Sequence, residues 1–362
     1  MKFTDKQKAV YLLSMTKGIG QVKGNKILKS VSNAEKICYD IASIRYELLR
    51  CITEADYREI CVALSTVDFS QIESECTVKG IKVVCLLDEE YPSSLACYDD
   101  APLMLYCKGD VKLLSKDCFA VVGTRFPTKY GIRVTEEFTA SLSDRFCIVS
   151  GMARGIDSCA HRRALESGGK TIAVLGCGVD VIYPAENRAL YRDIVENGLV
   201  ISEYLPGEAA NAHNFPARNR IISALSRAVL ITEAGENSGT MITLNYAIEQ
   251  GKDVFCVPGS IYNKQSQGCN KSIKACQTRA ATDVNDIFDE LGLSKTENIK
   301  PSELQLDFNE DVIISLLTNN GEMHFDELIQ HVDLSVSQLN ALLLKMMALG
   351  LIIKTKNNYW SI

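Results

Sequence analysis

The middle of the chain alternates short apolar runs with longer stretches of mixed polarity. The runs are Phe119–Val122, Cys147–Val149, Thr171–Leu175, Leu199–Glu203, Ala228–Thr232 and Asp253–Val257. Their β-branched residues predict strands, and the stretches between most of them have the length and periodicity of helices. Strands that alternate with helices favour a parallel sheet covered on both faces, and the lack of polar alternation fits strands buried on both sides. The pattern therefore predicts an α/β fold.

Residues 1–70 are predicted to form a helical domain of the helix-hairpin-helix or SAM-like kind. Helices are expected at Lys6–Met15 and Val22–Lys29, on either side of a short turn that contains Gly18 and Gly20. In a helix-hairpin-helix, backbone N–H groups at the start of the second helix can face a DNA phosphate. A plain helical turn in a small interaction domain gives the same short pattern, so both interpretations stay open.

The C-terminal part has a different plan. Residues 293–306 lack a periodic apolar pattern and are predicted to be a linker. Residues 307–362 read as three helices and a hairpin, at Val312–Leu317, Phe325–His331, Val336–Leu349 and Leu351–Ile362. This is the order of a winged-helix domain, whose third helix enters a DNA groove when it binds DNA. Here that helix carries only Lys345 and the domain is acidic, which favours a protein partner, although DNA stays an alternative for both end domains.

Composition limits the class of protein. Of 362 residues, 46% are hydrophobic and 23% charged, which excludes a disordered chain and suits two or three globular domains. No apolar run is long enough to span a membrane, and residues 1–10 lack the apolar stretch of a signal peptide, so we expect a cytoplasmic protein. None of the 14 cysteines is three residues from another, which argues against a zinc ribbon or a thioredoxin-like motif.

The arginines are concentrated in one part of the chain. The net charge is −6, yet residues 110–290 hold 12 of the 15 arginines. Because the planar guanidinium binds two phosphate oxygens at once, a phosphate site is expected in this part. Arginines on solvated helix faces would give a similar count.

The residues that follow the predicted strands supply candidates for that site. Ligands of open parallel sheets bind beyond the carboxyl ends of the strands, where backbone N–H groups at helix N-termini attract anions. Tight turns need glycine in any case, but several such loops together with two arginines favour phosphate binding. The candidates are Gly123, Thr124, Arg125, Ser150, Gly151, Arg154, Gly155, Gly176, Gly178, Ser238, Gly239 and Thr240.

Two nucleotide fingerprints are missing from the sequence. GxxxxGK[ST] does not occur, which argues against ATP hydrolysis of the P-loop kind. GxGxxG does not follow Phe119–Val122, which argues against a dinucleotide site. We therefore predict no nucleotide cofactor. We also predict no metal site.

Residues 119–290 resemble the DNA-processing protein A family, DprA, also called Smf. The matching blocks are VVGTR at 121–125, SGMARGID at 150–157, GKTIAVLGCGVDVIYP at 169–184, SEYLPG at 202–207, FPARNRIISALS at 215–226, SGTMIT at 238–243 and QGKDVFCVPG at 250–259. His161 also matches. The flanking domains resemble the family's end domains more weakly.

This resemblance implies a fold and a function. It implies an extended Rossmann-like domain over residues 76–292 that binds single-stranded DNA, forms a homodimer and is not an enzyme. Such proteins protect incoming strands during natural transformation. They also load RecA recombinase onto them, including strands coated by single-strand-binding protein.

The resemblance also carries site residues over. Gly123, Thr124 and Arg125 match the family's DNA-backbone loop, and Ser238, Gly239 and Thr240 match its turn at a helix N-terminus. The FPxRNR block adds four residues, namely Phe215, Arg218, Asn219 and Arg220. One position departs from the family, because Ala185 stands where members often carry a DNA-binding lysine. Arg188 lies within one helical turn and would substitute for it.

Purely structural roles are an alternative for several of these residues. Arg218 or Arg220 would serve equally well in a buried ion pair with Glu203 or Glu233, which would leave one arginine for DNA. Phe215 would stack on a base or pack in the core. Asp157 and His161 have the i, i+4 spacing of an acid–base or metal pair. No third ligand is near and Asp157 suits an N-cap, so a structural role is favoured for both.

The rival function is that of a nucleotide-processing enzyme. Lysine-decarboxylase-like phosphoribohydrolases have a related domain with the motif PGGxGTxxE, whose glutamate acts on the glycosidic bond. Here Thr243 and Leu244 occupy the region of that glutamate. The lost carboxylate argues against hydrolysis.

Overall fold

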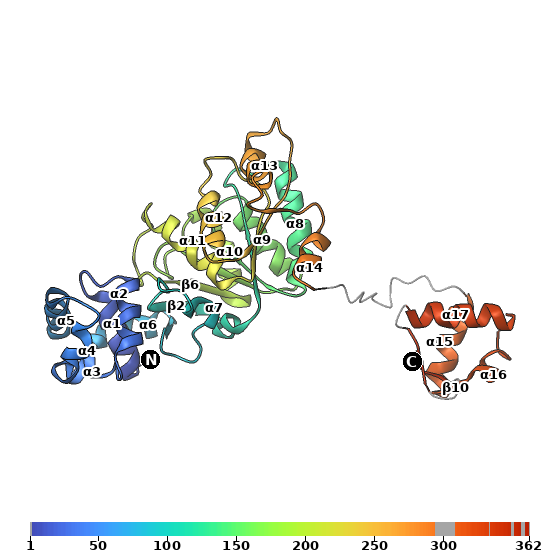
Figure 1. Cartoon of the computed structure of the whole chain (residues 1–362), viewed down its shortest axis with the longest axis horizontal. Coiled ribbons are helices and arrows are strands. Elements are labelled where there is room, and N and C mark those ends of the chain that lie inside the picture. Colours follow the sequence, from blue (N-terminus) through green and yellow to red (C-terminus); the bar gives the residue numbers. More distant parts are fainter. Residues whose placement is uncertain (1, 294–307, 333, 349–350, 356–358, 362) are drawn as a thin grey trace. The chain divides into compact units, whose positions relative to one another are not determined.

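The computed structural model describes residues 2–293, 308–332, 334–348, 351–355 and 359–361. It contains two compact units, residues 1–293 and residues 294–362, which are described separately (Figure 1). The predicted linker at 293–306 lies outside the described residues, apart from Leu293.

A nine-stranded sheet organises the first unit. Its spatial order is β1-β2-β6-β5-β4-β3-β7-β8-β9. The strands are β1 Lys82–Cys85, β2 Met104–Gly109, β3 Cys118–Val122, β4 Cys147–Ser150, β5 Thr171–Val174, β6 Leu199–Ser202, β7 Ala228–Ile231, β8 Asp253–Cys256 and β9 Arg279–Ala280. Strands β3 to β9 pair in parallel, while β2 pairs antiparallel with β1 and β6. The six predicted strands and their parallel arrangement are confirmed.

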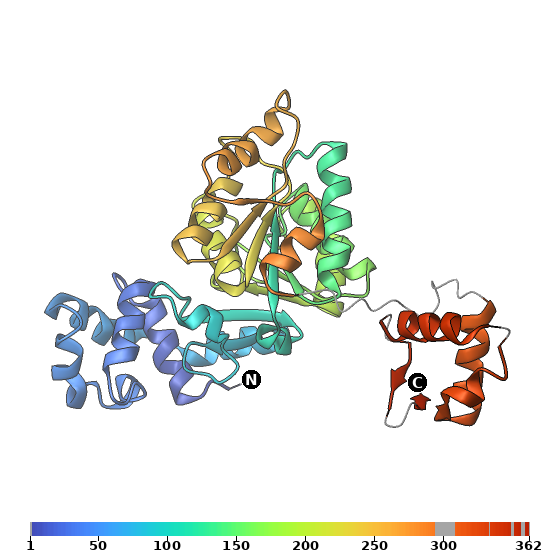
Figure 2. The same cartoon turned by 45° about the vertical axis from the view of Figure 1, so that its right-hand side comes forward.

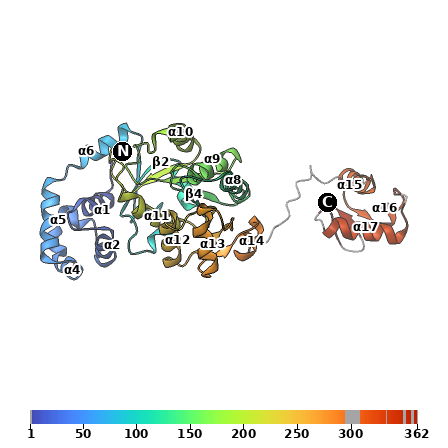
Figure 3. The same ribbon diagram turned by 90° about the horizontal axis from the view of Figure 1, so that it is seen from above.

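Helices cover both faces of this sheet (Figure 3). One layer holds α8 Lys129–Ser143, α9 Ile156–Glu166, α10 Arg188–Asn197 and α14 Val284–Glu290; the other holds α11 Asn214–Leu225, α12 Thr240–Glu249 and α13 Gln267–Lys274. Within β3, Phe119 packs with the α8 side and Ala120 with the α11 side. The side chains on both faces of the strand are therefore apolar, and this explains why the hydrophobic runs in the sequence are unbroken.

The N-terminal helices pack against the β1–β2 edge of the sheet (Figures 1 and 2). They are α1 Asp5–Met15, α2 Gln21–Ser30, α3 Lys36–Tyr39, α4 Arg45–Leu49, α5 Glu54–Thr66 and α6 Phe69–Val78, with a 3₁₀ turn at Ile41–Ile44. A capping box at Thr4 and Gln7 starts α1. Leu12 of α1 and Tyr106 of β2 belong to one buried core. The compact unit therefore continues across the predicted boundary near residue 70.

Four shorter elements connect the others. They are α7 Ser93–Ala96 and the 3₁₀ turns Val111–Ser115, Ala185–Asn187 and Lys264–Ser266. In the described part of the chain, no helix is both long and apolar enough to cross a bilayer.

The second unit is a small helical body with a short sheet. It contains α15 Phe308–Asn320, α16 Phe325–Leu328, α17 Val336–Ala348, β10 Met323–His324, β11 Ile353–Lys354 and β12 Tyr359–Ser361. The strands lie in the order β10-β12-β11, and Trp360 is buried with Leu339 and Leu343. The helices occur in the predicted order and β10 is an additional strand. Membership of the winged-helix class stays a prediction.

Candidate nucleic-acid interface

The order of the strands marks one place for a ligand. From β3 the chain builds β4, β5 and β6 on one side and then β7, β8 and β9 on the other. The loops after β3 and β7 therefore diverge, which opens a crevice at the carboxyl ends of these two strands. A cleft of about 730 Å³ lies there, and a smaller hollow of about 120 Å³ adjoins it. Arg125, Phe215 and Arg218 line both.

Most of the candidates from the sequence meet at this place. Twelve of them line the cleft, the adjoining hollow or both, namely Gly123, Thr124, Arg125, Gly151, Arg154, Gly176, Phe215, Arg218, Asn219, Ser238, Gly239 and Thr240. They come from the loops after β3, β4, β5 and β7 and from the start of α11. Their contact with DNA stays a prediction.

Three other candidates support the loops from within. Ser150 is fully buried, and its hydroxyl donates to the carbonyl of Val121 at 2.7 Å. Gly155 has φ of +76°, and a Cβ there would come within 2.4 Å of a backbone oxygen. At Gly178 a Cβ would meet the backbone of residues 205–208 at 2.6 to 2.9 Å. These residues are therefore required for packing and do not line the cleft.

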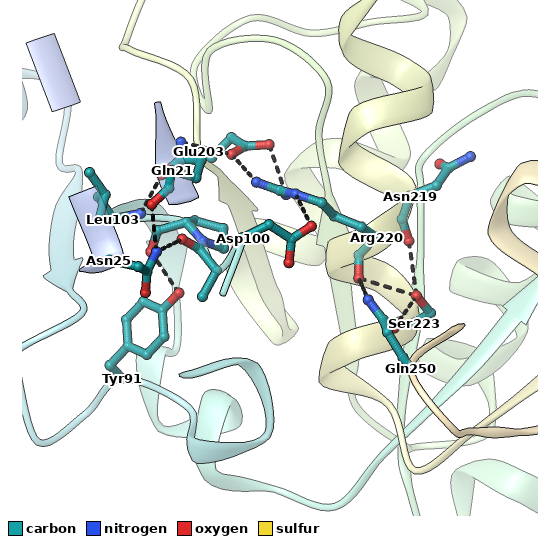
Figure 4. A network of polar contacts seen from close by, with 12 residues as sticks. Gln21, Asn25, Tyr91, Asp100, Leu103, Glu203, Asn219, Arg220, Ser223 and Gln250 are labelled. Carbon is teal, nitrogen blue, oxygen red and sulfur yellow. Dashed lines mark hydrogen bonds and ion pairs between the residues drawn. The ribbon is translucent and has the colours of Figure 1, made fainter. Parts of the chain in front are cut away.

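Two arginines also lie outside the cleft. The guanidinium of Arg220 donates two hydrogen bonds to the carboxylate of Glu203, at 3.1 and 2.7 Å, and pairs with Asp100 at 3.3 Å (Figure 4). Burial raises the pKa of Glu203, and the charge of Arg220 opposes this effect. Arg220 thus makes the ion pair with Glu203 that the sequence left open, and its contact with DNA stays a prediction. Arg188 is exposed at the first residue of α10, outside both hollows.

Arg218 forms part of the floor of the cleft. Only 4% of its surface is exposed, and its guanidinium donates to the carbonyls of Gly151, at 2.7 Å, and Val174. Burial raises the pKa of Asp157, and the positive charge of Arg218 opposes this rise. The Asp157 carboxylate in turn accepts the N–H of Ala153 at 3.3 Å. These contacts fix the loop after β4 to the end of β5, so Arg218 mainly holds the site together.

Arg125 is an exposed cation at the mouth of the cleft. Its guanidinium carbon lies 5.9 Å from the ring centre of Phe215, and no ion pair holds it among the described residues. The ring of Phe215 lies 5.2 Å from that of Tyr183, at an interplanar angle of 35°. Phe126, next to Arg125, is 72% exposed. A cation and three aromatic rings are therefore available to phosphates and unpaired bases.

The buried carboxylate of Glu233 holds the loop that carries Arg125. It accepts the N–H and the hydroxyl of Thr128, both at 2.8 Å, and the side-chain amide of Asn263 at 3.1 Å. The carbonyl of Glu233 accepts the N–H of Thr124 at 2.7 Å. Because its acceptors are occupied in this way, Glu233 fixes the mouth of the cleft.

The N-terminus of α12 also lines the cleft. The hydroxyl of Ser238 accepts the N–H of Thr240 at 3.2 Å, and no side chain caps the helix at Gly239. The positive end of the helix dipole thus faces the cleft, close to Lys264. The sequence interpretation missed Lys264, Phe126 and Tyr183. Two of them had a signal in the sequence, because Phe126 directly follows Arg125 and Tyr183 belongs to the Tyr–Pro pair at 183–184.

Asp157 and His161 are buried, which agrees with the structural role that the sequence favoured. Asp157 is not the N-cap, however, because Gly155 holds that position and Asp157 is the second residue of α9. His161 is fully buried, with Nδ1 2.7 Å from the Thr171 hydroxyl, while Nε2 accepts the N–H of Met152 at 3.3 Å. Burial lowers the pKa of His161 to about 3. The ring supports Met152, whose φ of 58° is unusual for a residue with a side chain. Among the described residues there is no cluster of side chains that fits a metal ion.

Comparison with known proteins agrees with this picture. The family model described as DNA recombination-mediator protein A matches residues 82–292. The chain belongs to this family. Its curated relatives include the DNA processing protein DprA of Streptococcus pneumoniae, 47% identical over 52% of this chain and 67% of the relative. DprA of Bacillus subtilis is 37% identical over 62% of this chain and 75% of the relative.

Two solved structures of the family are similar to this chain. The X-ray structure of DprA from S. pneumoniae has a TM-score of 0.69 and 37% identity, and the match covers 80% of this chain and 99% of that one. A DprA structure from Helicobacter pylori has a TM-score of 0.54 and 32% identity and covers 58% and 95%. That structure is described as showing a unique mode of single-stranded DNA binding. The predicted family and its Rossmann-like fold are confirmed.

Proposed function

We propose that this recombination mediator binds single-stranded DNA in the cleft beyond β3 and β7, without enzymatic turnover. The observation that carries the proposal is the group at the mouth, where Arg125, which has no ion pair among the described residues, lies over Phe215 and Phe215 lies against Tyr183. An arginine can bind a phosphate, and aromatic rings that line a cleft can stack on the faces of bases.

This arrangement favours a single strand over a duplex. In a duplex the base faces are stacked on one another, so the rings of Tyr183 and Phe215 have no partner there. In a single strand each base has a free face, and stacking is tolerant of sequence. Backbone N–H groups at the start of α12 and Lys264 add contacts to the phosphates without reading bases. We therefore expect single-strand binding with little sequence preference.

The wider role is proposed from the family. We propose that the chain acts as a homodimer, protects single strands during natural transformation or recombination and loads RecA recombinase onto them, also when single-strand-binding protein coats the DNA. The H. pylori relative supports the DNA-binding step of this proposal.

The proposal is tested with the purified full chain. Anisotropy of a labelled oligothymidylate should rise on binding, and a blunt duplex of the same length should compete weakly. Equal affinity for both would contradict it. Incubation with nucleoside monophosphates should release no base, and release would favour the hydrolase alternative. RecA filament formation on coated strands should be faster with the chain present, and no acceleration would contradict the loading role.

A further inference from the structure

Lys79 links the N-terminal helices to the loop after β5. Lys79 follows α6, and its ammonium group lies 2.6 Å from the carboxylate of Asp180 and 2.5 Å from that of Glu75. The carboxylate of Asp180 also accepts the N–H of Gly207, in the loop after β6, at 2.7 Å. One third of the Lys79 side chain is exposed, against 14% of Asp180. Asp180 therefore ties α6 to two loops of the sheet at once.

Gln21 forms a second link, which joins α2 to the start of the loop after β6. Its side-chain oxygen accepts the N–H of Leu103 at 2.8 Å, and its nitrogen donates to Glu203 at 3.2 Å (Figure 4). Glu203 is the partner of Arg220 on α11. Through Glu203, α2 is connected to the helix that begins at the cleft.

Both links lead to the aromatic rings at the mouth of the cleft. The loop after β5 carries Tyr183, and the first turn of α11 carries Phe215. The N–H of Gly178 donates to the carbonyl of Glu208 at 2.8 Å, so the two loops also hold each other. The loops that position Tyr183 against Phe215 are thus the loops that the N-terminal helices hold.

We infer that the N-terminal helices keep the cleft in its binding shape, and that Lys79 and Gln21 are positioning residues for single-stranded DNA. The inference rests on the proposed function. Neither residue lines the cleft, and two carboxylates neutralise Lys79. Lys79 and Gln21 raise the fraction of molecules in which the rings of Tyr183 and Phe215 are positioned to stack on bases. The apparent affinity for the single strand rises with that fraction.

The test compares full-length variants by oligothymidylate anisotropy over a range of salt concentrations. Lys79→Met should weaken binding by roughly 3- to 10-fold, in proportion to the loss of the competent fraction. The slope of log affinity against log salt should stay unchanged, because no phosphate contact is removed. Lys79→Arg should restore binding, since it keeps the pair with Asp180. A slope shallower by about 0.7 would instead make Lys79 a DNA contact and overturn the inference.

A matched control is available on another N-terminal helix. Lys29 of α2 pairs with Asp99 at 2.8 Å, and that pair does not reach the loops after β5 or β6. Lys29→Met should therefore leave the affinity unchanged. An equal loss in Lys29→Met and Lys79→Met would show a general effect of charge and contradict the inference.

A double-mutant cycle separates positioning from general destabilisation. If Lys79 acts through the stacked rings, adding Lys79→Met to Phe215→Ala should cause no further loss. Gln21→Leu should behave like Lys79→Met in both backgrounds. Additive losses, or full affinity in both single variants, would overturn the inference. If the unmodified chain fails to bind oligothymidylate, the proposed function fails as well; if it binds and Lys79→Met binds equally, only the inference fails.

Discussion

The guanidinium carbon of Arg125 lies 5.9 Å from the ring centre of Phe215, although Arg125 belongs to the loop after β3 and Phe215 to the first turn of α11. Both residues line the cleft and the hollow that adjoins it. Arg125, Phe126 and Tyr183 are exposed beside the partly buried ring of Phe215, so a cation and aromatic rings are accessible to a ligand.

Arg125→Ala should weaken single-strand binding without lowering the melting temperature, because the side chain is exposed and has no carboxylate partner among the described residues. The salt slope should become shallower by about 0.7, the contribution of one phosphate contact. Arg227→Ala is the control, since Arg227 precedes β7 at the opposite end of the sheet and pairs with Asp117. An unchanged slope in Arg125→Ala would remove Arg125 from the site.

Phe215→Ala should weaken binding while the salt slope stays the same. Loss of one stacked base is worth about 1–3 kcal/mol, or roughly 5- to 150-fold in affinity. Phe215→Trp should retain binding because it keeps an aromatic face. Full affinity of the alanine variant would assign Phe215 to packing alone, which is the other interpretation of its place in the sequence.

Arg220→Ala should act on stability before it acts on DNA. Removing one partner of a buried ion pair leaves the Glu203 carboxylate uncompensated and destabilises a protein by about 3–5 kcal/mol. Urea unfolding should show this loss, and Glu203→Gln in the Arg220→Ala background should recover part of it. A stable Arg220→Ala variant with a shallower salt slope would return Arg220 to the DNA site.

The free energy of unfolding should decrease at acidic pH, and protonation of His161 should account for part of the decrease. Its pKa in the folded chain is about 3, below the ordinary value near 6.5, so the unfolded chain binds the extra proton first. Stability is therefore lost as the pH falls from about 6.5 toward 3, by roughly 2 kcal/mol between pH 7 and pH 5. Urea titrations at both pH values should show a smaller difference in His161→Gln. An equal difference would contradict a buried neutral ring.

The sheet could be predicted from the sequence because its strands are buried on both faces. Runs such as Phe119–Val122 stay apolar throughout, and local pattern alone identifies them. The cleft followed from the same pattern, since parallel strands bring their carboxyl ends to one edge.

Partners across the fold could not be predicted in the same way. Arg218 and Arg220 have similar sequence surroundings, yet the helix places one under the loop after β4 and the other against Glu203. Gln21 and Glu203 meet only because the N-terminal helices pack on the sheet. No local periodicity reports such contacts, so the sequence could not tell which arginine of the matching block pairs with Glu203.

Photocrosslinking tests the central claim most directly. An oligothymidylate that carries 4-thiothymidine is bound to the full chain, irradiated, and the crosslinked peptides are identified by mass spectrometry. We predict crosslinks at the mouth of the cleft, on the peptides that contain Phe126, Tyr183 and Phe215, and their loss when unlabelled single strands compete. Crosslinks confined to residues 1–70 or 308–361, with none from the loops after β3, β5 and β6, would contradict the account.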